Sequence, residues 1–291
     1  MLYSISTARF FLLIAFSLIY AIFDVFNKRN VPNKFVYFSI IIGILATLSY
    51  YPDLRMLGIS FLIASIIGSM GYILYKKGVL GGGDVFEFML ISLIIPLQPR
   101  PLLINMPQYA LPFVLSVFIV TGYVSFMAIA FYYLLLVKNP EIEKRIKPDR
   151  KPALVSSAFL TMYVLLIYVM GMINGFSSSA ILLIALVAIP SSIVLAYEKL
   201  INARMVSMML PEKLEEGDMI AVNMMNGDES AYFSKRYSHF GRLATNELIS
   251  EMKNEKKKLP VYSNAPPLAL FTFAGVILAL LFGNVLLYFL L

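Results

Sequence analysis

The sequence contains no cysteine, no tryptophan and a single histidine, His239. Without cysteine the chain can form no disulfide, no thiolate nucleophile, no cysteine–zinc site and no iron–sulfur cluster. One histidine cannot build a metal centre made of several imidazoles. Charged residues are also scarce, at 14% of the chain, whereas a soluble domain has about 25%. We therefore expect a protein that works without a metal or a cofactor.

Apolar residues are in excess and make up 59% of the 291 positions. A soluble domain has about 45–50%, so the surplus is too large for one water-soluble core and indicates an integral membrane protein. A helix needs roughly 20 mostly apolar residues to cross the hydrocarbon core. We predict an all-α polytopic membrane protein with about eight transmembrane helices, at residues 10–26, 35–50, 56–75, 80–97, 111–137, 153–172, 180–197 and 267–291.

Basic residues indicate how these predicted spans are oriented. If the amino terminus lies outside the cytoplasm and the spans alternate, all but three of the 24 lysines and arginines fall in cytoplasmic loops. The three exceptions are Arg9, Arg55 and Arg100. Such enrichment is typical of the cytoplasmic loops of membrane proteins. We therefore interpret the net charge of +7 as an orientation signal, and predict a multi-pass cell-membrane protein with no nucleic-acid partner.

The sizeable segment outside the predicted spans is residues 198–264, just before the last span. A glycine–aspartate turn is expected to lead into a short strand at 219–222. Thr245 or Asn246 is expected to cap a helix that runs to about Lys257. We interpret this segment as a small cytoplasmic α+β insert. The predicted domains are a transmembrane catalytic helix bundle (1–197), the insert (198–264) and a C-terminal transmembrane helix (265–291).

Three acidic residues lie in or beside the predicted spans: Asp24, Asp84 and Glu87. An aspartate at the centre of a transmembrane helix costs about 2.5–3.5 kcal/mol on insertion scales, so each carboxyl group needs a reason to be there. Asp24 lies at the inner end of the first span and Asp84 at the inner start of the fourth. Both are therefore expected at the same depth, near the cytoplasmic boundary. The residues after Asp84 are too few to cross the bilayer, so the glycine turn before it is expected to dip into the membrane.

Two carboxyl groups at that depth can support hydrolysis. When they lie a few ångströms apart they cannot both ionise, so the pair holds one proton over a wide pH range. One carboxylate can then act as general base on water while the other, protonated, polarises a scissile carbonyl. Glycines before Asp84 would permit the turn and let a substrate backbone approach closely. We predict Asp24 and Asp84 as the catalytic residues, with Gly81 and Gly83 as backbone support.

Structural roles compete with this interpretation. The spacing of Asp84 and Glu87 resembles a capping box, so Asp84 could simply cap the helix that follows the glycines. Asp24 could pair with Lys28 one turn later. Glu87 is expected to belong to the cap, or to pair with Lys76 or its neighbouring lysine, rather than to take part in catalysis.

These residues together resemble a known family. Asp24 ends the first span, Pro32-Asn33 follows it, and a Gly-x-Gly-Asp motif stands at 81–84. In this the sequence resembles the type IV prepilin peptidases, which are aspartic membrane proteases. The resemblance is closer to their archaeal members, the preflagellin and prepilin peptidases, which are also similar in their carboxy-terminal extension. It is specific over about residues 15–97 and weaker beyond.

The resemblance implies an aspartic endopeptidase that removes the leader peptide of type IV pilin-like or archaellin precursors at the cytoplasmic membrane face. Asp24 and Asp84 would activate water, with the hydrophobic segment of the precursor among the helices. The precursor is the expected protein partner, and the sequence does not define an oligomeric state. Further residues that are candidates for contacting the substrate or supporting the aspartates are Glu87, Lys28, Pro32 and Asn33.

Two departures from the family bear on substrate preference. Phe86 stands where the family often has a lysine, and the interval from Asp24 to the Pro-Asn pair is one residue longer than in the bacterial pattern. Two other functions stay open. A presenilin-like intramembrane protease also has two aspartates and a Gly-x-Gly-Asp motif, and residues 152–154 match its Pro-Ala-Leu tripeptide, but its first aspartate lies on a late helix. An ion- or proton-coupled transporter or scaffold would use the carboxyl groups for binding alone.

Overall fold

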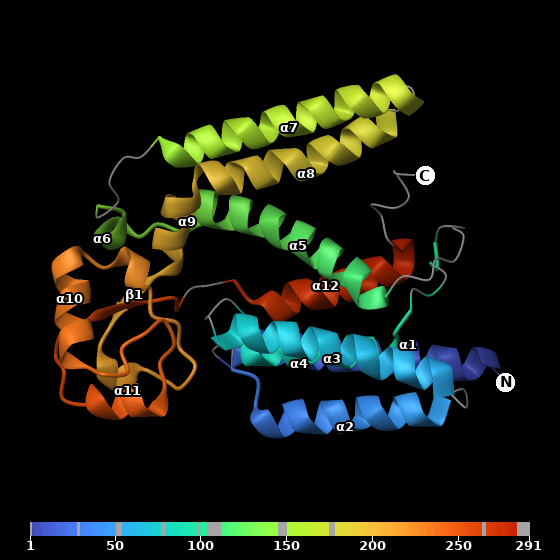
Figure 1. Cartoon of the computed structure of the whole chain (residues 1–291), viewed down its shortest axis with the longest axis horizontal. Helices are drawn as coiled ribbons and strands as arrows, with labels where there is room; N and C mark the ends of the chain where they lie inside the picture. Colours follow the sequence, from blue (N-terminus) through green and yellow to red (C-terminus); the bar gives the residue numbers. More distant parts are fainter. Residues whose placement is uncertain are drawn as a thin grey trace. The chain divides into compact units, whose positions relative to one another are not determined.

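A computed structural model shows a mostly helical chain with one small sheet (Figure 1). The chain divides into two compact units: Met1–Ser125 with Pro267–Leu291 is the first, and Phe126–Pro266 is the second. This division differs from the predicted domains, because the last helix groups with the first unit and the helices just before the insert group with the insert. The structure describes residues 2–27, 30–50, 54–76, 80–97, 99, 101–103, 112–144, 150–174, 178–263 and 266–283.

The first unit is a helix bundle built around its shortest helix, α4. Helix α4 packs against α1, α2, α3 and α12, and α1 to α4 run alongside one another in Figure 1. Leu90, Ile91 and Ile94 of α4 are fully buried in the apolar core of this unit. Because neighbours surround α4, its polar groups must find partners inside the bundle. The helices are α1 (Leu2–Phe26), α2 (Asn33–Tyr50), α3 (Leu54–Lys76), α4 (Gly82–Ile94), α12 (Leu268–Phe282) and the beginning of α5 (Phe113–Phe131).

Side chains from two other helices hold the carboxyl end of α4. The guanidinium of Arg9, on α1, donates to the Leu93 carbonyl oxygen at 3.3 Å. The hydroxyl of Thr47, on α2, donates to the same oxygen at 2.8 Å. A cation is stabilised near the carboxyl end of a helix, which is the negative pole of the helix dipole. Arg9 therefore has a structural reason to be buried, and with Thr47 it fixes α4 lengthwise against α1 and α2.

Glycines let neighbouring helices approach α4 closely. A Cβ atom added at Gly71 of α3 would lie 2.5 Å from Val85 Cγ1, and one added at Gly68 would lie 2.8 Å from the Met89 sulfur. On α2, a Cβ at Gly43 would lie 2.8 Å from a methyl group of Leu90. Small residues at helix contacts are typical of membrane bundles, where van der Waals packing drives association.

The second unit combines a helix pair with the insert. Helices α7 (Lys151–Asn174) and α8 (Ser178–Ala196) lie side by side (Figure 1). Helix α5 continues into one π-helical turn, η1 (Tyr132–Leu136), followed by α6 (Pro140–Glu143). Arg204 joins this region to the insert, because its guanidinium binds Glu143 at 2.8 Å and donates to the Tyr133 carbonyl oxygen at 2.6 Å. The remaining elements are α9 (Glu198–Met205), β1 (Ser207–Met209), η2 (Pro211–Lys213), η3 (Val222–Met224), α10 (Gly227–Arg236), α11 (Asn246–Glu251) and β2 (Leu259–Val261).

The insert contains helices and strands, as predicted, but their positions differ in detail. Its two strands, β1 and β2, pair antiparallel, while the predicted strand at 219–222 makes only isolated bridges and ends in a 3₁₀ turn. Thr245 caps α11 as predicted, with its hydroxyl accepting from the Leu248 N–H at 3.3 Å. Helix α11 stops at Glu251 instead of Lys257. Helix α10 was not predicted. Its amino end nevertheless has a capping pattern that the sequence contains, because the Glu229 carboxylate accepts a hydrogen bond from the Asn226 N–H at 3.1 Å.

The apolar helices are compatible with membrane insertion. Among the described residues, four helical segments are long and apolar enough to cross a bilayer: Thr7–Phe26, Leu54–Lys76, Phe113–Leu136 and Lys151–Val169. Shorter apolar helices cover Asn33–Ser49, Val187–Ala196 and Leu268–Phe282. Helix α4 has 13 residues and is about 20 Å long, which is less than a hydrocarbon core of about 30 Å. Four of the eight predicted spans thus contain a helix of this kind, and the count of eight is not confirmed. Residues 284–291 of the last predicted span lie outside the described residues.

Close packing at Gly71 leads to a test within one helix. Gly71→Ala should destabilise the bundle by about 1–3 kcal/mol, the usual cost of overpacking, because the new methyl group meets Val85. Gly58→Ala, also on α3, should not destabilise it, because nothing lies within 4 Å of its added Cβ. Thermal unfolding of the purified protein measures both variants. The double variant Gly71→Ala/Val85→Ala should recover part of the loss, and no recovery would contradict this assignment of the contact.

Candidate active site

Asp24 lies in the last turn of α1 and is buried, with 6% of its surface exposed. Its carboxylate accepts a hydrogen bond from the backbone N–H of Ala269, in the first turn of α12, at 2.9 Å. Ser17 and Tyr20 precede it at helical spacing, so the three side chains form a polar stripe on an otherwise apolar helix. Lys28, the predicted ion-pair partner of Asp24, lies outside the described residues.

Asp84 lies in the first turn of α4, and Gly81 immediately precedes the helix. The Gly81 N–H donates to Asp84 Oδ2 at 3.2 Å, which is the return half of a capping box. Glycine has no side chain to supply the other half. A Cβ at Gly81 would lie 2.8 Å from the Asp84 carboxylate, and one at Gly83 would lie 3.0 Å from a methyl group of Val31. The lack of a side chain at these glycines therefore leaves room for a neighbouring group of this chain, the Asp84 carboxylate at Gly81 and Val31 at Gly83.

The two predicted aspartates lie on helices that pack together, α1 and α4. Asp24 is in the last turn of α1 and Asp84 in the first turn of α4, and the two carboxyl groups lie within range of each other's charge. Glu87 interacts with both of them. The first unit thus brings three carboxyl groups from two helices into one region, in which Asp24 and Glu87 are buried and Asp84 is half-buried.

Glu87 is fully buried, with 0% exposure. Among the described residues, neither of its carboxyl oxygens has a hydrogen-bond partner, although the Ser17 hydroxyl lies next to it. The expected cap role is wrong, because Asp84 supplies the cap acceptor and Glu87 lies one turn farther into the bundle. Lys76 lies over the Tyr72 ring at 5.5 Å, and the neighbouring lysine lies outside the described residues.

Tyr20 extends this polar region toward α2. Its hydroxyl lies 2.8 Å from the Ser39 hydroxyl, which in turn donates to the Val36 carbonyl oxygen at 2.8 Å. Tyr20 also lies within electrostatic range of Asp84 and Glu87. Ser17, Tyr20 and the first turn of α12 are site components that were not predicted from the sequence. The polar stripe of α1 could have indicated the first two, but no sequence signal indicates a contact with α12.

Pro32 and Asn33 lie at the beginning of α2. The Pro32 carbonyl oxygen accepts hydrogen bonds from the backbone N–H groups of Phe35 and Val36 at 2.9 and 3.1 Å, so it starts the helix. Asn33 is the first residue of α2 and is exposed. The structure thus gives these residues a role in setting the loop that brings Val31 against Gly83.

Among the described residues, no group of three or more histidine, cysteine or acidic side chains is arranged to hold a metal ion. The comparisons with known proteins add no functional assignment. No protein-family model, curated protein or solved structure matches the chain.

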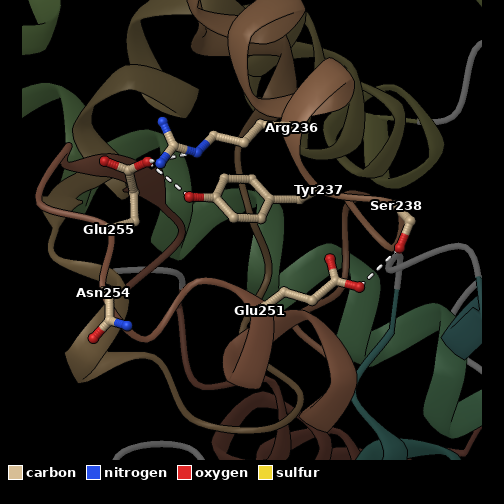
Figure 2. Close-up of a pocket in the computed structure, with 6 residues that line it drawn as sticks. All are labelled: Arg236, Tyr237, Ser238, Glu251, Asn254 and Glu255. Carbon is tan, nitrogen blue, oxygen red and sulfur yellow. Dashed lines mark hydrogen bonds and ion pairs between the residues drawn. The ribbon is translucent and has the colours of Figure 1, made fainter.

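The insert contains a surface pocket of about 460 Å³, shown in Figure 2. One of its lining residues, Glu255, is buried, with 9% of its surface exposed. Glu255 accepts hydrogen bonds from the hydroxyls of Tyr237 at 2.7 Å and Tyr232 at 2.9 Å, and from the Lys257 N–H at 3.0 Å. The residues that line the pocket are Arg236, Tyr237, Ser238, Glu251, Asn254 and Glu255.

These contacts set the charge in the pocket. Burial opposes ionisation of Glu255, but the donors from Tyr237, Lys257 and Tyr232, together with nearby Arg236, outweigh it and hold the pKa of Glu255 below its ordinary value. Burial and the hydrogen bond to Glu255 raise the pKa of Tyr237 to about 12. The pocket therefore contains a stable carboxylate that accepts from two tyrosine hydroxyls and one backbone N–H. Because Glu255 follows α11 and is held by tyrosines on and just after α10, the chain beyond Glu251 is drawn toward α10 and the helix ends early.

A substitution at Glu255 tests this network. Since the pKa of Glu255 is lowered on folding, its stabilisation is present above the pKa of the unfolded chain and is lost as pH falls through the folded value. Glu255→Gln should therefore loosen the insert at pH 7 by about 1–3 kcal/mol, and the difference from wild type should shrink toward pH 3. Hydrogen exchange of the β2 amides measures this. Glu216→Gln, at an exposed position, should change nothing, and equal effects of the two variants would contradict the assignment.

Proposed function

We propose that the protein is a membrane aspartic endopeptidase that removes leader peptides from type IV pilin-like or archaellin precursors. The observation that carries the proposal is that Asp24 and Asp84 lie on two packed helices of an apolar bundle, within range of each other's charge. Two carboxyl groups that share a proton can activate water and polarise a carbonyl. No other side chain is required for peptide hydrolysis by this route.

The proposed topology has eight spans, with the amino terminus outside and the dyad near the cytoplasmic face. Helix α4 is short and starts directly after Gly81. This supports a topology in which the chain enters the membrane as a turn and the helix begins below the membrane surface. The bias of basic residues supports the same orientation. The precursor would place its hydrophobic segment among the helices and its basic leader residues at the cytoplasmic surface.

Substitution of each aspartate tests the proposal. Asp24→Asn and Asp84→Asn should each lower cleavage of a pilin-type precursor in membranes at least about 100-fold, the usual contribution of a general acid or base. Asp228→Asn, an exposed position in the insert, should retain wild-type turnover. Immunoblotting of the precursor and its shortened product measures cleavage, and membrane extraction checks that the variants are inserted. Full activity in either dyad variant would rule out the proposed dyad.

One observation favours a second class of function. Glu87 is fully buried, and its oxygens have no hydrogen-bond partner among the described residues, as expected of a carboxyl group that carries a proton. A proton-coupled transporter or scaffold would use it together with the aspartates. That alternative predicts no precursor cleavage by wild type, and a proton flux into liposomes that Asp24→Asn abolishes. A presenilin-like protease would instead cut within the hydrophobic segment, which mass spectrometry of the product would show.

A further inference from the structure

The first turn of α12 contacts the proposed dyad directly. Ala269 is buried, and its backbone N–H donates to Asp24 Oδ2 at 2.9 Å. The N-cap residue of α12 is Pro267, whose side chain provides no cap. The N–H groups of a first helical turn lack partners within their own helix. The Asp24 carboxylate therefore supplies an acceptor that the local sequence of α12 does not.

This contact distinguishes the three carboxyl groups of the region. Asp24 receives a backbone donor at 2.9 Å from the amino end of the 15-residue helix α12. Both aspartates lie at the amino end of a helix, α12 for Asp24 and α4 for Asp84, where the helix dipole favours negative charge, so the donors themselves distinguish them. Asp84 receives its donor, the Gly81 N–H, at the longer distance of 3.2 Å. Glu87 receives none from the described residues. Because carboxylates in one apolar region repel each other, a single negative charge settles where donors stabilise it best.

We propose that Ala269 is a positioning residue that keeps the charge of the dyad on Asp24, so that Asp24 is the general base and Asp84 the general acid. This assignment rests on the proposed peptidase function. Asp24 takes a proton from water, the water oxygen bonds to the scissile carbonyl carbon, and Asp84 gives its proton to the carbonyl oxygen. Asp24 then passes its proton to the leaving nitrogen as the C–N bond breaks, and Asp84 recovers a proton from the hydroxyl as the carbonyl re-forms.

Ala269→Pro removes this N–H at the second position of α12, in the first turn, where no hydrogen bond within the helix is lost. It should lower kcat for precursor cleavage at least about tenfold, the value of a hydrogen bond to a charged group, with KM unchanged. The acidic limb of the pH profile of kcat/KM should move toward higher pH, because the base has lost its donor. Loss of folded protein alone would lower kcat without moving that limb.

Leu268→Pro is the matched control. It removes the neighbouring N–H of the same turn, whereas the donor to Asp24 described above is the Ala269 N–H. Pro267 before it already has the extended conformation that precedes a proline. This variant should keep kcat within about twofold of wild type and leave the pH profile unchanged, since first-position proline suits a helix.

If Ala269→Pro is not inserted, replacement of Ala269 by lactate through nonsense suppression removes the N–H and keeps the methyl side chain. The same kcat loss and pH shift are then expected. The role of Ala269 would be overturned if wild type cleaves the precursor and the Ala269 variant matches Leu268→Pro in kcat and pH profile. That result would leave the proposed peptidase function intact. A wild-type protein that cleaves nothing would instead overturn the proposed function.

Discussion

The structure depends on one constraint: carboxyl groups buried in an apolar helix bundle must be supplied with donors or carry a proton. Ionised carboxylates without partners are costly in such surroundings, so charge collects where backbone N–H groups are available. Helix termini provide those groups. Asp24 receives one from α12 and Asp84 receives one at the beginning of α4, whereas Glu87 lies one turn farther into the bundle beside the Ser17 hydroxyl.

The position of α4 follows from the same constraint. Its amino end presents Asp84 to α1, and its carboxyl end presents a carbonyl oxygen to Arg9 and Thr47. Arg9 and Asp24 are on the same helix, so the contact at one end of α4 sets the depth of Asp84 relative to Asp24 at the other. Glycines such as Gly71 let α3 lie close enough to keep α4 in place. A helix of this length suits a buried turn better than a full crossing of the membrane.

Local patterns in the sequence predicted the parts of the fold that depend on them. The apolar runs of α1 and α3, and the Thr245 cap, are determined by residues close in the chain. Contacts between distant segments were not predictable: Ala269 is 245 positions from Asp24, and Glu255 ends α11 through tyrosines on and just after α10. The sequence indicated Asp24 and Asp84 because buried acids are rare, but it could not indicate that Glu87 points inward instead of joining the cap.

If Asp24 and Asp84 form one site, cross-linking in native membranes detects their proximity most directly. The chain has no cysteine, so in the double variant Asp24→Cys/Asp84→Cys a thiol reagent can react only with the two introduced cysteines of this chain. A short bifunctional thiol reagent should join it, giving one linked fragment after cleavage between the two helices. The pair Ile22→Cys/Asp84→Cys should stay unlinked, because Ile22 is 45% exposed on another face of α1. Equal linking of the two pairs, or none at positions 24 and 84, would contradict the account.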